Sequence, residues 1–161
     1  MMTKRRALAL FAAAPAILKA AETKPTPTTG EKLLTEFWAK VWNLPQDLDT
    51  IDRLCTGDFV LTSGGKDIVG RKAFKEWVKG FSAKIGDMRL TNLDMFTSAD
   101  GTRVVSRWIM KGVNLGMLGT AADRQPVEFT GIAVWEVRDG KLAHNWVERS
   151  ALELKERLGG K

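Results

Sequence analysis

The sequence predicts an α+β domain in which helices come first and a curved antiparallel sheet follows. Apolar residues recur at helical spacing over residues 33–42 and 71–85. From residue 88 onward they recur with the period of strands, and Asp-Gly pairs at 100–101 and 139–140 mark hairpin turns. Helices followed by a meander of strands predict a sheet that curls around its helices.

Two helices are predicted near the start of the domain. Thr28 and Thr29 are candidate caps for the first, whose apolar side runs over residues 33–42, and Pro45 ends it. Asp47 is the expected cap of a second, shorter helix. Cys55 falls on the apolar side of that helix and is interpreted as a small buried hydrophobic residue.

The remaining elements follow in order. A strand is predicted over residues 59–62, a turn over 63–67 and a third helix over 71–85. A short helix over 151–158 closes the chain. Four long antiparallel strands lie between these last two helices, at residues 88–96, 103–113, 127–137 and 141–149.

Composition limits the classes of function. A chain of 161 residues with 44% hydrophobic and 27% charged residues fits one globular domain. One cysteine and one histidine exclude an internal disulfide and a Cys/His zinc site, so a metal would need carboxylate ligands. We expect neither a metal nor a cofactor.

The net charge of +6 does not indicate a nucleic-acid partner, because part of it lies at the N-terminus. Residues 1–21 hold four basic residues and no acidic one, which leaves 21 basic against 19 acidic residues with no basic run.

The first 21 residues have the layout of an export signal. A basic start is followed by an apolar run over Ala7–Leu18 and by small residues at Ala20-Ala21. The run is too short to cross about 30 Å of hydrocarbon, so no stable membrane anchor is expected. Arg5-Arg6 resembles a twin-arginine signal. The alternative is an amphipathic N-terminal helix on a cytoplasmic protein.

This signal predicts export to the periplasm or outside a bacterial cell. Residues 22–30 are rich in Pro and Thr and predict an extended linker, so the mature domain is expected over 31–161.

Several segments, in order and at familiar spacing, resemble the SnoaL-like polyketide cyclases of the nuclear-transport-factor-2-like superfamily over about residues 31–159. They are Asp49–Leu54, Asp58–Leu61, Ile68–Phe74, Arg107-Trp108, Gly112–Gly116, Pro126–Ile132, Trp135–Leu142 and Trp146–Glu148. The resemblance implies a cone-shaped fold with an apolar cavity between the helices and the sheet. It also implies a homodimer, for which a sheet face bearing Ile132, Val134 and Trp146 is suited.

The resemblance implies ring closure by cofactor-free aldol chemistry, which requires a group that moves protons. Asn114 stands where many members have a His, and Asn donates a hydrogen bond to an oxyanion but takes no proton. Ala133 and Val147 occupy two further positions where a His and an acid are expected. The scaffold also hosts binding proteins, so it does not settle the activity.

The last strand supplies the remaining candidates for catalysis. Alternation places His144, Trp146 and Glu148 on one face, and Asn145 and Val147 on the other. Glu148 is a candidate acid/base, provided that a bulge turns it to the cavity; the alternative is a surface ion pair with Arg149 or Arg107. His144 is the only side chain with a pKa near neutrality, and its alternative is a structural role.

The candidate ligand-binding residues are aromatic or polar. Trp38, Trp108 and Trp135 could line a cavity for a small apolar or aromatic ligand, or belong to the core. Asn114 and Asn145 could polarise a carbonyl. Arg107 could bind a carboxylate or enolate, or form a cross-strand ion pair.

Two functions remain open at this point. The first is an exported, cofactor-free proton-transfer enzyme of the cyclase or isomerase type. The second is a non-catalytic small-molecule-binding or dimerisation module on the same scaffold.

Overall fold

The computed structural model describes residues 26–159. The predicted export signal and the first part of the predicted linker lie outside these residues. Within them, no helix is long and apolar enough to span a bilayer.

Helices α1 (Thr29–Phe37), α2 (Thr50–Leu54) and α3 (Arg71–Ser82) precede the main strands, as predicted. Thr28 caps α1: its hydroxyl accepts from the Glu31 backbone N–H, and the Glu31 carboxylate accepts from the Thr28 N–H. The helix therefore begins inside the segment predicted as linker. It continues into one π-helical turn, η1 (Trp38–Trp42).

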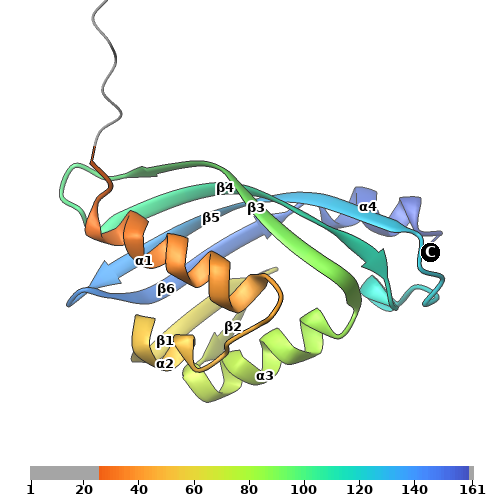
Figure 1. The fold of residues 1–161 in the computed structure, drawn as a ribbon, viewed down its shortest axis with the longest axis horizontal. Helices are drawn as coiled ribbons and strands as arrows, with labels where there is room; N and C mark the ends of the chain where they lie inside the picture. Colours follow the sequence, from red (N-terminus) through yellow and green to blue (C-terminus); the bar gives the residue numbers. More distant parts are fainter. Residues whose placement is uncertain (1–25, 160–161) are drawn as a thin grey trace, which may run out of the picture.

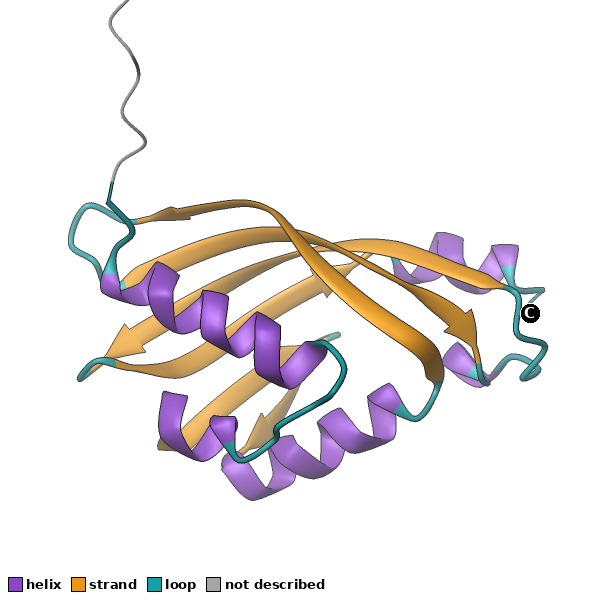
Figure 2. Ribbon diagram, viewed as in Figure 1, coloured by secondary structure: helices purple, strands orange, loops and turns teal. Residues whose placement is uncertain are grey.

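Six strands form one curved sheet in the order β2-β1-β6-β5-β4-β3. Their bounds are β1 (Cys55–Ser63), β2 (Lys66–Val69), β3 (Ile85–Thr97), β4 (Arg103–Asn114), β5 (Pro126–Arg138) and β6 (Lys141–Arg149). The strands arch over the helices, as Figures 1 and 2 show, and the core lies between the two layers. The predicted α+β class is confirmed.

Three local predictions were wrong. Cys55 begins β1 instead of ending a helix, and a strand, β2, lies partly within the predicted turn. Helix α3 ends at Ser82, and Ile85 begins β3, where it pairs with Asn114 of β4. Ile85 fits both the helical and the strand period, so the pairing with β4 decides its conformation.

One pair of strands also differs from the antiparallel prediction. Strands β1 and β6 are parallel, with Leu61 opposite Asn145, whereas the other neighbours are antiparallel. This pairing joins segments far apart in the chain, which local patterns do not reveal.

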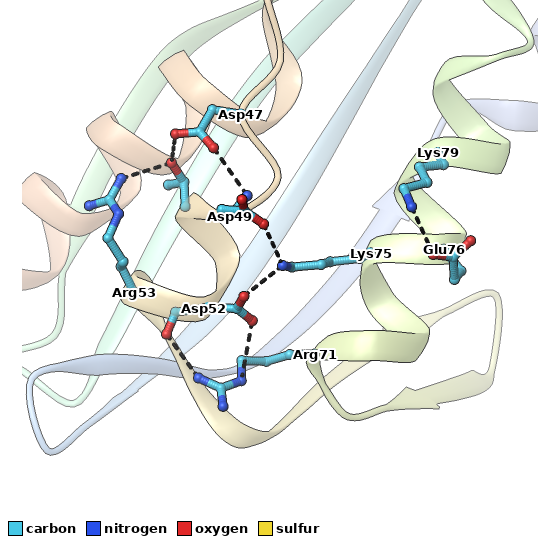
Figure 3. Close-up of polar contacts among 9 residues, drawn as sticks. Asp47, Asp49, Asp52, Arg53, Arg71, Lys75, Glu76 and Lys79 are labelled. Atoms are coloured by element: carbon cyan, nitrogen blue, oxygen red, sulfur yellow. Dashed lines mark hydrogen bonds and ion pairs between the residues drawn. The ribbon is translucent and has the colours of Figure 1, made fainter.

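A surface network of charges joins α2 to α3 (Figure 3). The Lys75 ammonium contacts the carboxylates of Asp49 at 2.9 Å and Asp52 at 2.6 Å. The Arg71 guanidinium donates to the Asp52 carbonyl oxygen at 2.8 Å. The hydrogen bond from Lys75 is the main cause that lowers the pKa of Asp52. These contacts connect two helices whose buried sides, including Ile51 and Phe74, belong to the core.

Candidate functional site

Strand β6 provides the floor of the candidate site. Its side chains alternate, so Asn145 and Val147 are buried on the helix-facing side while Glu148 is exposed. The same alternation carries Arg149, the last residue of the strand, to the helix-facing side.

An inner cavity lies where β6, β4 and β3 meet η1 and the end of α3. Its volume is about 20 Å³, enough for about one water-sized group. We call this space the inner cavity; its walls are Trp38, Trp42, Phe81, Leu90, Trp108, Met110, Asn145, Val147 and Arg149.

Four of these lining residues also carry a polar atom that is buried without a hydrogen-bond partner. These atoms are the indole Nε1 atoms of Trp38, Trp42 and Trp108, and Oδ1 of Asn145. Only one other side-chain atom among residues 26–159 is buried in this unpaired state. Because an unpaired buried polar group costs about 1–3 kcal/mol, a concentration of four at one cavity indicates a place for a polar ligand group.

Trp135 shows the contrasting arrangement. Its indole is fully buried and its Nε1–H donates to the Ser106 hydroxyl at 3.2 Å. Its ring packs against Phe37 with 5.1 Å between ring centroids and against Trp38 with 5.5 Å. The structure therefore places Trp135 in the core behind the cavity and outside its walls.

Arg149 brings a positive charge to the inner cavity. Its guanidinium lies over the Trp77 ring at 5.4 Å and the Phe81 ring at 5.5 Å, and its Nη1 donates to the Ser63 hydroxyl at 2.6 Å. Burial lowers the pKa of Arg149 to about 10, with a smaller opposing effect of the Glu148 charge. The group is still protonated at pH 7.

No carboxylate of residues 26–159 forms an ion pair with Arg149 within 4.0 Å. The predicted alternative for Glu148, an ion pair with Arg149 or Arg107, is therefore absent from this part of the chain.

An outer pocket of about 240 Å³ adjoins the inner cavity and shares Phe81, Val147 and Arg149 with it. Its walls include residues of η2 (Met117–Gly119) and of α4 (Ala151–Arg157). Helix α4 is on the right in Figure 1. We call this space the outer pocket; its other walls are Ser63, Gly64, Met117, Leu118, Phe129, Glu148, Ala151 and Leu154.

Asn114 does not line the outer pocket but holds the loop that carries Met117, one of its walls. Its Nδ2 donates to the Ala121 carbonyl at 2.7 Å and to Asp123 Oδ1 at 3.0 Å. Its Oδ1 accepts from the backbone N–H groups of Gly116 at 3.0 Å and Met117 at 2.9 Å. The amide is thus occupied within the loop that carries η2, and Asn114 holds Met117 in place instead of lining either cavity.

The structure separates the two predicted catalytic residues from the inner cavity. Glu148 is exposed at the edge of the outer pocket. His144 lies on the opposite face of the sheet, where its ring stacks on that of Trp146 with 3.7 Å between the ring centroids. Its Nε2 is 2.8 Å from the Thr62 hydroxyl. Burial lowers the pKa of His144. Arg107 is also exposed on that outer face.

Of the predicted ligand-binding residues, Trp38, Trp108 and Asn145 meet at the inner cavity. Sequence reasoning missed Trp42 and Arg149 as members of the site. Both had a usable signal: Trp42 lies four residues after Trp38 on the same helical face, and Arg149 continues the alternation of Asn145 and Val147. Among residues 26–159, no group of three His, Cys, Asp or Glu side chains is placed to hold a metal ion.

Comparison with known proteins adds a family and a fold. A family model described as a SnoaL-like domain matches residues 34–145. No curated protein matches the sequence.

Solved structures resemble this one at low sequence identity. A candidate SnoaL-like polyketide cyclase from Jannaschia sp. CCS1 has a TM-score of 0.76 and 14% identity over 88% of this chain and 99% of that chain. TsrD from Streptomyces laurentii has a TM-score of 0.73 and 21% identity over 86% of this chain and 100% of that chain. A third structure is a protein with a ketosteroid isomerase-like fold from Catenulispora acidiphila, solved with trimethylamine. It has a TM-score of 0.66 and 14% identity over 81% of this chain and 94% of that chain. At these identities the likeness establishes the fold.

Proposed function

The chain belongs to the SnoaL-like domain family, and on that premise we propose that it binds a small organic molecule across the inner cavity and the outer pocket. The observation that carries the proposal is the set of four unpaired polar atoms on residues that line the inner cavity. A bound molecule would supply the partners that the protein does not, while its apolar part would cover Phe81 and Val147.

Binding is favoured over proton-transfer catalysis. The walls of the inner cavity contain no carboxylate and no imidazole, and Arg149 is protonated at neutral pH. General acid/base chemistry needs a group within reach whose pKa lies near the operating pH. The export predicted from residues 1–21 would place this binding activity outside the cytoplasm.

A cyclase or isomerase activity is the second candidate. The polyketide cyclase-type fold of the solved neighbours supports it, as do the indole N–H groups and Arg149, which could stabilise an enolate oxygen. Glu148, the carboxylate in the wall of the outer pocket, could then move a proton.

A pair of variants tests the binding proposal. Val147→Phe fills the space shared by the inner cavity and the outer pocket, whereas Val134→Phe makes the same change on a partly buried residue of the neighbouring strand β5, which lines neither. A panel of small planar organic molecules is screened by calorimetry against the wild type. We expect at least one to bind, Val147→Phe to weaken it at least tenfold, and Val134→Phe to keep its affinity.

The outcomes separate the two candidate functions. Equal binding by both variants would contradict the cavity as the site. Each ligand found is then incubated with the protein in D₂O and followed by NMR. An unchanged ligand supports binding alone, whereas deuterium incorporation next to a carbonyl, or ring closure, favours the catalytic candidate. In that case Glu148→Gln should remove turnover and leave affinity nearly unchanged.

A further inference from the structure

Arg149 is a largely buried cation for which residues 26–159 provide no carboxylate. Buried charges in proteins are normally paired, because an isolated one is costly to remove from water. The guanidinium has five N–H donors, and the described side chains accept one hydrogen bond from it, at Ser63. Its remaining donors suit an oxyanion.

The other polar groups of the inner cavity have the same character. Trp38, Trp42 and Trp108 contribute N–H groups, which only donate. Asn145 Oδ1 is the single unpaired acceptor, and rotation of the amide by 180° replaces it with a donor. The wall of the inner cavity is therefore complementary to a group that accepts several hydrogen bonds.

We propose that the ligand is an organic carboxylate that pairs with Arg149 where the two spaces meet. One carboxylate oxygen enters the inner cavity towards the indole N–H groups, and the apolar body of the ligand fills the outer pocket. This inference rests on the proposed function and specifies its ligand class.

The sizes of the two spaces agree with this division. The inner cavity, about 20 Å³, admits one water-sized group such as a carboxylate oxygen, whereas the outer pocket, about 240 Å³, admits a ring system. Met117, Phe129 and Leu154 make much of the outer wall apolar. Arg149 lines both spaces, so it lies where a carboxylate on such a body would enter.

The aromatic wall also suits a quaternary ammonium ion, which binds to the faces of Trp and Phe rings. The positive charge of Arg149 in the same wall would repel such an ion, and the wall offers it one acceptor oxygen. This alternative is the strongest competitor and becomes one arm of the test.

The test compares three probes with one ring system on the wild-type protein: 2-naphthoate, 2-naphthamide and (2-naphthylmethyl)trimethylammonium. Titration calorimetry at pH 7 should show naphthoate binding at least tenfold more tightly than the amide, with no binding of the ammonium ion. Equal binding of naphthoate and the amide, or tighter binding of the ammonium ion, would overturn the proposal.

Two variants assign the preference to one residue. Arg149→Gln should weaken naphthoate at least tenfold and bring naphthoate and naphthamide within about twofold of each other, while Arg149→Lys should restore part of the preference. Arg107→Gln removes an exposed arginine from the opposite face and should change nothing. Loss of the preference in both glutamine variants would point to the overall charge and contradict the assignment. Circular dichroism checks that each variant is folded.

Failure of this inference differs from failure of the proposed function. Suppose that a neutral planar molecule binds the wild type but not the Val147→Phe variant, and that naphthoate does not bind the wild type. The cavity is then a ligand site, and the carboxylate class is wrong. If no panel member and no naphthyl probe binds the wild type, both are contradicted.

Discussion

Substituting Gly131 by alanine should destabilise the domain and displace a wall of the inner cavity. Gly131 of β5 pairs with Trp108 of β4. A methyl group at this position would lie 2.2 Å from Trp108 Cζ2 and 2.8 Å from the Glu148 carbonyl oxygen. Carbon atoms in contact are normally about 3.5–4.0 Å apart, so the indole must move by about 1 Å or more.

Overpacking of this kind costs about 1–3 kcal/mol. With a urea m-value of about 2 kcal/mol/M, the midpoint of unfolding should fall by about 0.5–1.5 M. Tryptophan fluorescence follows the transition. The ring displacement should also weaken any ligand of the inner cavity, since Trp108 is part of its wall.

Gly80 provides the matched control. It lies within α3, is exposed, and a methyl group there would meet nothing within 4 Å. Alanine is preferred over glycine in a helix by about 0.5–1 kcal/mol, so Gly80→Ala should raise the urea midpoint. If Gly131→Ala is as stable as the wild type, or shifts the midpoint in the same direction as Gly80→Ala, the close approach of Trp108 to β5 is refuted.

Two further predictions concern titratable groups outside the cavity. Burial raises the pKa of the Cys55 thiol to about 12. The native protein should therefore not react with a thiol reagent at pH 8 until urea unfolds it. Rapid labelling of the native protein would contradict the buried position of Cys55. The pKa of His144 is lowered from 6.5, mainly by burial, so between the two pKa values the unfolded chain binds more protons than the folded one. Stability should therefore decline as the pH falls below about 6.5. Urea midpoints measured at pH 7.5, 6.5 and 5.5 should decline less for His144→Gln than for the wild type. An equal decline in both proteins would show that His144 is not responsible.

The sequence predicted the class of fold and much of the last strand. Alternation correctly separated Asn145 and Val147 from His144 and Glu148, because a strand with one buried face imposes a period of two. The same rule reaches Arg149. A charged residue at the end of a strand is nevertheless usually exposed, and this expectation outweighed the alternation for Arg149.

Other features depend on contacts that no local pattern contains. The parallel pairing of β1 with β6 joins Ser63 to Val147 and so brings the Ser63 hydroxyl to Arg149. The role of Asn114 follows from the return of the chain through residues 116–125, which occupies its amide on both sides. From composition, Trp38 and Trp135 were equal candidates. They are separated by the Ser106 hydroxyl of β4, which accepts the hydrogen bond of the Trp135 Nε1–H.

The most direct test of the account observes the indole N–H groups themselves. In protein labelled with ¹⁵N at tryptophan, and with peaks assigned by single Trp→Phe variants, addition of 2-naphthoate should shift the Nε1–H signals of Trp38, Trp42 and Trp108 downfield as they gain an acceptor. The Trp135 signal, already bonded to Ser106, should move least and serves as the internal reference. If the three signals stay in place while naphthoate is bound, or if Trp135 shifts most, the inner cavity is not the ligand site.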